Sequence, residues 1–173
     1  MKSVSNKLYE FKKLGYFEII DYEFSRNFVD YIKNYNNLDK NIGITISLLV
    51  SSHDPKLAYP MIKKLTTHDK MSVLKEVINK KFNETNNEMV KEFDEWIKKA
   101  STTRTERNQL IHGSWSLAGS VTETPIIFSP TNWDIEEKSD KNKKFSLDEF
   151  KIIVEELKDV CSEFGKLRRK YPF

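Results

Sequence analysis

One group of polar residues has the types and spacing needed to bind a phosphate group and move a proton: Arg104, Arg107, Asn108 and His112. An arginine is permanently charged, and its planar fork of N–H donors matches phosphate oxygens. Histidine is the side chain that exchanges protons most readily near neutral pH. Asn108 precedes His112 by four residues, so their side chains can meet on a helix. From residue types and spacing alone, the group allows chemistry on a phosphate ester, and it also fits arginines paired with Glu or Asp beside a histidine that ends the helix.

One long helix is expected to position these residues, from Asn86 to about His112. Thr85 and Glu88 have the spacing of a capping box, in which two side chains satisfy free backbone amides at a helix start. Gly113 follows as the expected C-cap. Apolar residues repeat at intervals of three and four and predict a stripe that faces the core: Met89, Phe93, Trp96, Ile97, Ala100 and Ile111.

Polar residues replace apolar ones in the last turns of that stripe. On a helical wheel, Arg104, Arg107 and Asn108 fall on the same face as the apolar residues. Burying a guanidinium without a counterion is costly. We therefore expect the stripe to open there onto a cleft, a partner subunit or an acidic group.

The remaining sequence predicts further helices and one β-prone segment. A helix is expected over residues 17–35, where asparagines at 34, 36 and 37 should end the pattern, and a second over residues 42–51. A third should run from Asp54-Pro55 through Leu65, with Pro60 kinking or interrupting it. Further helices are expected after Thr67 and from a capping box at residues 146–149 onward. Residues 115–121 and 125–128 predict a small β-hairpin, and residues 134–144 an exposed loop. The expected fold class is mainly α.

The composition suits one globular domain over residues 1–173, with 38% hydrophobic and 32% charged residues. Five glycines and five prolines are too few for an all-β sandwich. The net charge of +3 allows a nucleic-acid partner without requiring one. The first residues lack an apolar signal stretch, and no apolar run approaches the roughly 18 residues of a membrane span. We therefore expect a cytoplasmic protein with no membrane association.

Other reactive residues are expected to be structural. Cys161 has no partner for a disulfide or a zinc site, so a buried thiol is expected. His53 and His68 are isolated, and no glycine-rich phosphate loop is present, so neither a metal nor a cofactor is expected. A basic group near the C-terminus is interpreted as a solvated helix end, favoured by the helix dipole: Lys166, Arg168, Arg169 and Lys170.

The motif and its surroundings resemble a known family. Residues 107–115 read Arg-Asn-Gln-Leu-Ile-His-Gly-Ser-Trp and closely resemble the signature of HEPN domains (higher eukaryote and prokaryote nucleotide-binding). That signature is an arginine, usually followed by a polar residue such as asparagine, and then a histidine after a short spacer. Here four residues intervene, near the end of a long expected helix. The resemblance covers about residues 42–115 in helix order, and extends less closely to the final helix.

The resemblance implies a HEPN-like bundle of about four to five helices, with the small β-hairpin between the motif helix and the C-terminal helix. It also implies a homodimer in which the motif helices of two protomers line one cleft. Many family members are metal-independent endoribonucleases that serve as toxins, antiviral defence effectors or RNA-processing enzymes. Others keep the fold only for binding.

For this chain the resemblance implies RNA cleavage by 2′-hydroxyl attack, without metal or cofactor. The catalytic residues it implies are Arg107, Asn108 and His112, and the substrate-binding residues are Arg104, Ser114 and Trp115. Arg107 and His112 lie about 140° apart on the wheel, so a second copy is expected to supply the missing groups. The expected partners are RNA and a second copy, with an antitoxin or regulatory protein as a further candidate.

Two alternatives remain open. The chain could be a non-catalytic HEPN-like module that binds nucleotide or RNA, or a helical adaptor in which a carboxylate such as Glu106 or Asp94 neutralises Arg107. Ser114 stands where family members paired with a minimal nucleotidyltransferase antitoxin carry the modified tyrosine, so regulation by tyrosine adenylylation is not supported. Trp115 suits either stacking on a base or packing the helix end.

Overall fold

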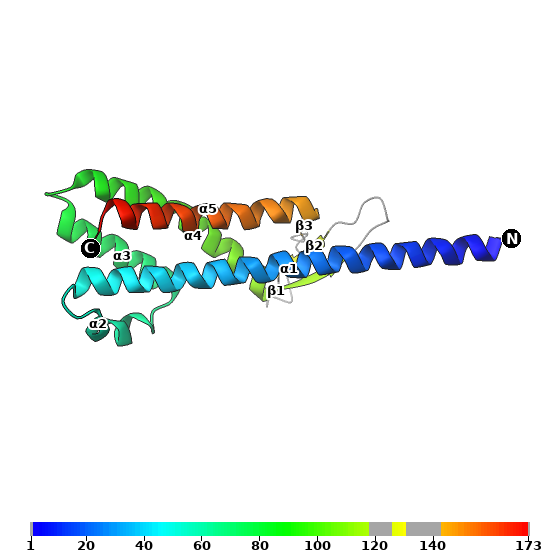
Figure 1. Ribbon diagram of the computed structural model, residues 1–173, viewed down its shortest axis with the longest axis horizontal. Helices are drawn as coiled ribbons and strands as arrows, with labels where there is room; N and C mark the ends of the chain where they lie inside the picture. The colour runs from blue at the N-terminus through cyan, green and yellow to red at the C-terminus, as the bar shows by residue number, and fades with distance from the viewer. Residues whose placement is uncertain (1, 118–125, 131–142, 173) are drawn as a thin grey trace, which may run out of the picture. The chain divides into compact units, whose positions relative to one another are not determined.

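The computed structural model describes residues 2–117, 126–130 and 143–172. This part of the chain is mainly α-helical, as the sequence predicts (Figure 1). Its elements, in chain order, are α1 (Lys2–Val50), α2 (Pro55–Ile62), α3 (Thr67–Phe82), α4 (Asn87–His112), β1 (Gly113–Leu117), β2 (Ile126–Pro130), β3 (Lys143–Phe145) and α5 (Leu147–Lys170).

Two compact units divide the chain. The first consists of Met1–Tyr31 and Asn108–Glu155, and the second of Ile32–Arg107 and Glu156–Phe173. Helix α4 passes from the second unit into the first between Arg107 and Asn108, inside the motif. The single domain over residues 1–173 stays a prediction.

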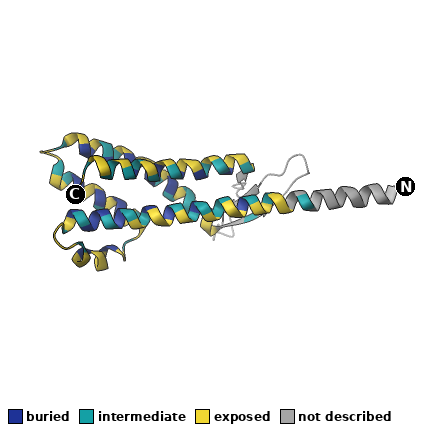
Figure 2. Cartoon of the chain, viewed as in Figure 1, coloured by how far each residue is buried: buried dark blue, intermediate teal, exposed yellow. Residues whose placement is uncertain are grey.

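Helix α1 is continuous through the asparagines that were expected to end it. The predicted break between residues 35 and 42 is therefore wrong. Asparagine is only mildly unfavourable inside a helix, and buried apolar contacts readily compensate for it. Figure 2 shows buried positions recurring along the described part of α1. The row of buried residues runs across the expected break: Tyr31, Tyr35, Leu38, Ile42, Ile46 and Leu49.

Capping side chains explain where α2 and α3 begin. Asp54 accepts a hydrogen bond from the Lys56 amide at 3.1 Å, which confirms the predicted start of α2. Helix α2 contains Pro60 and ends at Ile62, before the predicted end at Leu65. Thr66 and Asp69 form the capping box of α3, each backbone amide donating to the other side chain at 3.2 Å.

Of the two capping boxes predicted for the starts of α4 and α5, the first is wrong and the second is correct. Asn86, rather than Thr85, accepts from the Met89 amide at 3.0 Å, because α4 begins one residue later than a Thr85 cap would require. The predicted Ser146 box is confirmed, since Ser146 and Glu149 exchange hydrogen bonds of 2.6 and 3.1 Å. These hydrogen bonds also lower the pKa of the Glu149 carboxyl.

The core of the second unit joins α1, α3, α4 and α5 through fully buried side chains. Trp96 of α4 is 2% exposed, and its Nε1 donates to the Val160 carbonyl of α5 at 3.0 Å. Its ring stacks on Phe164 with centroids 4.4 Å apart. Cys161 is half-buried, and its Sγ lies 3.7 Å from the Asn34 carbonyl oxygen. Burial raises the pKa of the Cys161 thiol to about 11, which keeps it protonated at neutral pH, as expected of a structural thiol.

The first unit contains a three-stranded antiparallel sheet in the order β1-β2-β3. Trp115 of β1 pairs with Phe128 of β2, and Ile126 of β2 pairs with Phe145 of β3. Strand β3 takes residues 143 and 144 from the segment that was predicted as an exposed loop. The rest of that segment, and residues 118–121 and 125 of the predicted hairpin, lie outside the described residues.

The helices of the described residues were also tested for membrane spans. Over residues 2–117 and 143–172, none has an apolar stretch of the length and hydropathy that crossing a bilayer requires.

Replacing Trp96 with phenylalanine tests the α4–α5 contact. Trp96→Phe removes the indole donor to the buried Val160 carbonyl and opens space beside Phe164. We expect the free energy of unfolding to fall by about 1–3 kcal/mol, measured by urea denaturation. Lys98→Ala, at an exposed position of the same helix, is the control and should change it by less than about 0.5 kcal/mol. Equal effects of the two variants would contradict the proposed packing.

Candidate functional site

The last turns of α4 carry the predicted catalytic residues in different environments. Arg107 is half-buried, whereas Asn108 and His112 are exposed. His112 is the last residue of α4. Gly113 was predicted as a C-cap but is instead the first residue of β1, paired with Pro130. The helix therefore runs directly into the sheet of the first unit.

The buried row of α4 follows a different path from the predicted stripe. Beyond Ala100 it passes through Thr103 and Leu110, both buried, while Ile111 is 36% exposed. The predicted placement of Asn108 and Ile111 on this row is therefore wrong. Residues 103, 107 and 110 continue the spacing of four and three, so Arg107 occupies a place in the row.

A charged cluster surrounds the ring of Tyr35 in the second unit. Tyr35 is 4% exposed, and the Arg107 Cζ lies 5.5 Å from the centre of its ring. This distance is within the range of a cation–π contact. The charges of Arg104 and Asp39 also act on the pKa of Tyr35, and the Tyr35 side chain forms a hydrogen bond with Thr67. We call this set, with the lysine that pairs with Asp39, the Tyr35 cluster: Tyr35 and Asp39 of α1, Thr67 and Lys70 of α3, and Arg104 and Arg107 of α4.

The carboxylate of the cluster is bound to a buried lysine. Lys70 Nζ lies 2.5 Å from Asp39 Oδ2, and the Lys70 side chain is only 8% exposed. The cluster itself contains three cations and one carboxylate. Among the described residues, the buried Nε of Arg104 has no hydrogen-bond partner. This nitrogen of Arg104 could donate to an anion.

Opposing effects act on the Tyr35 hydroxyl. Burial raises its pKa, and the Asp39 carboxylate adds to this increase. The hydrogen bond with Thr67 and the charges of Arg107 and Arg104 act in the opposite direction, but the pKa stays above its ordinary value. Tyr35 is therefore a neutral phenol at physiological pH.

The predicted substrate-binding residues after the helix lie in the first unit. Trp115 Nε1 donates to the Leu110 carbonyl at 2.9 Å. Its ring also packs beside three phenylalanines, with centroids 5.0–6.1 Å away: Phe24, Phe28 and Phe150. Trp115 thus packs the end of α4, and its contact with a base stays a prediction. Ser114 lies in β1 opposite Ser129, and its side chain lies outside the described residues.

The C-terminal basic residues make local contacts. Lys170 pairs with Glu92 at 2.7 Å and with Glu88 at 2.9 Å, which raises the pKa of the lysine. Arg168 lies 3.4 Å from Asn41 Oδ1. The interpretation of this segment as a solvated helix end stays a prediction.

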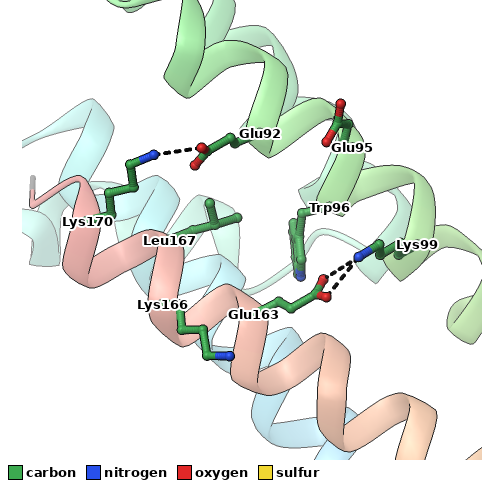
Figure 3. A pocket seen from close by; sticks show the side chains of 8 residues that line it. All are labelled: Glu92, Glu95, Trp96, Lys99, Glu163, Lys166, Leu167 and Lys170. Atoms are coloured by element: carbon green, nitrogen blue, oxygen red, sulfur yellow. Dashed lines mark hydrogen bonds and ion pairs between the residues drawn. The ribbon is translucent and has the colours of Figure 1, made fainter.

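A groove of about 340 Å³ is lined by residues of α4 and α5 (Figure 3). Trp96 and Leu167 form its floor, and the Lys170–Glu92 and Lys99–Glu163 pairs stand at its sides. A second groove of about 370 Å³ has carboxylates of Glu106, Glu156, Asp159 and Glu163 in its walls. Neither groove is lined by Arg107, Asn108 or His112.

One proposed counterion for Arg107 has another partner. Asp94 pairs with Lys75 at 3.2 Å. The position of Glu106, the other carboxylate of the adaptor hypothesis, in the wall of the second groove leaves that hypothesis undecided. Across the described ranges, no three histidine, cysteine, aspartate or glutamate side chains cluster as metal ligands.

The chain was compared with protein-family models, curated proteins and solved structures. No protein-family model matches the chain, and neither the curated proteins nor the solved structures contain a match. The HEPN resemblance therefore rests on the residues of the motif and on their place at the end of α4.

Replacing Asp39 tests the ion pair that anchors the cluster. Asp39→Asn removes the counterion of a lysine that is almost fully buried, so we expect the free energy of unfolding to fall by roughly 1–3 kcal/mol. Asp94→Asn is the matched control, because its partner Lys75 is 48% exposed; it should cost less than about 1 kcal/mol. Urea denaturation of both variants measures the difference, and an equal loss would show that burial of Lys70 does not matter.

Proposed function

We propose that the chain is a metal-independent endoribonuclease of the HEPN type, serving as a toxin or antiviral defence effector. The observation that carries this proposal is how the burial of side chains changes along the last turns of α4. The half-buried guanidinium of Arg107 contacts the ring of Tyr35. The amide of Asn108 and the imidazole of His112, which follow along the helix, are exposed. This arrangement provides a fixed positive charge and an accessible proton carrier on one helix.

The proposed reaction uses the RNA itself as the nucleophile. The 2′-oxygen attacks the adjacent phosphorus, the bond to the 5′-oxygen breaks, and the products are a 2′,3′-cyclic phosphate and a 5′-hydroxyl. One proton leaves the 2′-hydroxyl and one reaches the departing 5′-oxygen, and His112 is the group that transfers a proton. Arg107 stabilises the charge that develops on the phosphoryl oxygens. Asn108 orients His112 or the phosphate.

The proposed enzyme acts as a homodimer. The cleavage needs groups on both sides of the phosphate, and Arg107 and His112 diverge by about 140° around the helix axis. A second copy of α4 supplies the complementary pair. RNA is the substrate, and an antitoxin or regulatory protein is a further proposed partner.

Single substitutions test the catalytic residues. Arg107→Ala and His112→Ala should each lower the rate of RNA cleavage by at least about 100-fold, because each removes one part of the reaction. Purified variants are assayed on a mixture of structured and single-stranded RNAs, with folding checked by circular dichroism.

An exposed histidine and an exposed lysine outside the motif provide the controls. His68→Ala and Lys91→Ala should retain the wild-type rate, since both positions are exposed and outside the motif. Wild-type activity in either purified motif variant would contradict the proposal.

The chemistry of the products tests the mechanism separately. Cleavage should persist in EDTA, because no step uses a metal ion. The 3′ fragments should carry 5′-hydroxyl ends and the 5′ fragments cyclic phosphates, both identified by mass spectrometry. Dependence on a divalent ion together with 5′-phosphate products would contradict attack by the 2′-hydroxyl.

The Tyr35 cluster also favours a second candidate, a non-catalytic module that binds RNA or nucleotide. The buried Nε of Arg104, which has no hydrogen-bond partner, would donate to a phosphate without any proton transfer. Binding of RNA that Arg107→Ala weakens, with no cleavage by the wild type under any condition, would favour this candidate.

A further inference from the structure

Helix α2 of the second unit exposes large apolar side chains along one face. Leu57 is 72% exposed and Met61 is 67% exposed, and their spacing of four places them together on the helix surface. Tyr59, which lies between them in sequence, is 44% exposed. Figure 2 shows exposed positions over most of α2. Single exposed apolar residues are common on proteins, but a group of them on one short helix marks a contact surface.

A different flank of α2 packs against the rest of the second unit. Ala58 and Ile62 are buried, and they lie about 100° around the helix from the exposed pair. Ile62 packs over Gly43 of α1, where an added Cβ would lie 3.4 Å from the Ile62 Cγ2. The apolar side chains on the other flank are therefore not needed to attach α2 to the core.

Lysines accompany the exposed apolar face. Residues 51–66 contain three lysines, all exposed, and one acidic residue, Asp54. Asp54 caps α2 by accepting a hydrogen bond from the Lys56 amide at 3.1 Å. In the part of the chain that the structure describes, no ion pair involves Lys56, Lys63 or Lys64, whereas lysines of α3, α4 and α5 pair with carboxylates. The face thus complements a partner that is both apolar and anionic.

The size of the face argues against a protein partner. Burying an aliphatic side chain removes on the order of 100 Å² of apolar surface, so the exposed apolar side chains of α2 offer roughly 300 Å². A stable protein–protein interface buries about 800 Å² on each partner. A symmetric contact between two copies through this face would also bring their lysines together. RNA would engage the lysines but would leave Leu57 and Met61 in water.

A bilayer surface meets both requirements without a large interface. Each apolar side chain can enter the headgroup region separately, while lysines remain beside the anionic lipid phosphates. The sequence expectation of no membrane association rested on missing spanning and signal stretches, and a helix that lies on a bilayer needs neither.

We propose that α2 is an interfacial helix, which inserts its exposed apolar side chains into the headgroup region of an anionic lipid bilayer while its lysines contact the lipid phosphates. This surface lies outside the motif of α4, and its role does not depend on RNA cleavage.

Co-sedimentation of the full chain with lipid vesicles tests the proposal. Vesicles of phosphatidylcholine with about one-third phosphatidylglycerol should bind the wild type at least about ten-fold more tightly than vesicles of phosphatidylcholine alone, because three lysines face the headgroups. The double variants Leu57→Ser with Met61→Ser, and Lys63→Gln with Lys64→Gln, should each weaken binding to the anionic vesicles about ten-fold or more. All four positions are exposed, and circular dichroism checks that the variants are folded.

Matched controls carry the same kinds of substitution on other helices. Ile152→Ser changes an apolar side chain of α5 that is 58% exposed, and Lys91→Gln with Lys98→Gln removes two exposed lysines of α4. Both controls should keep wild-type binding within about two-fold, because charges far from the bilayer are screened by salt.

The outcomes that overturn the proposal are distinct. Absence of wild-type binding to the anionic vesicles would overturn it, and so would equal binding by all variants, because another surface would then be responsible. Without vesicle binding, a gel shift of single-stranded RNA that Lys63→Gln with Lys64→Gln weakens would assign the lysines to RNA instead. Self-association in sedimentation velocity that Leu57→Ser with Met61→Ser abolishes, again without vesicle binding, would assign the face to a second copy.

Discussion

The contact between the Arg107 guanidinium and the Tyr35 ring is the interaction on which the account depends. A charge that leaves water loses several kcal/mol of hydration, and a cation–π contact returns only about 0.5–2 kcal/mol. The contact with Tyr35 therefore accounts for only part of the stability of Arg107 at this half-buried position.

The surrounding ion pair fixes the platform for this contact. Lys70 and Asp39 join α3 to α1 with little access to water, and Thr67 joins the start of α3 to the Tyr35 hydroxyl. Because both partners of such a pair must be present, the geometry of the cluster is sensitive to single substitutions on any of its helices. The motif at the end of α4 thus depends on residues of α1 and α3 that no motif includes.

Local signals in the sequence predicted much of the helical structure. The Asp54 and Ser146 caps were correct, because a cap depends on side chains within three residues of the helix start. Longer-range features were not predictable in this way. Helix α1 continues through three asparagines because the buried residues on both sides outweigh their weak propensities, and the path of the buried row on α4 was misplaced by one position near Leu110. The Tyr35 cluster joins three helices, so no spacing along the chain reveals it.

The central claim is that Arg107 and His112 act on RNA phosphodiesters, and its most direct test is to sequence the RNA ends of bacteria that express the protein. Expression of the wild type and of His68→Ala should produce the same new 5′-hydroxyl ends at discrete positions, and His112→Ala should produce none. The same new ends in cells with His112→Ala, at wild-type abundance and equal protein level, would contradict the claim.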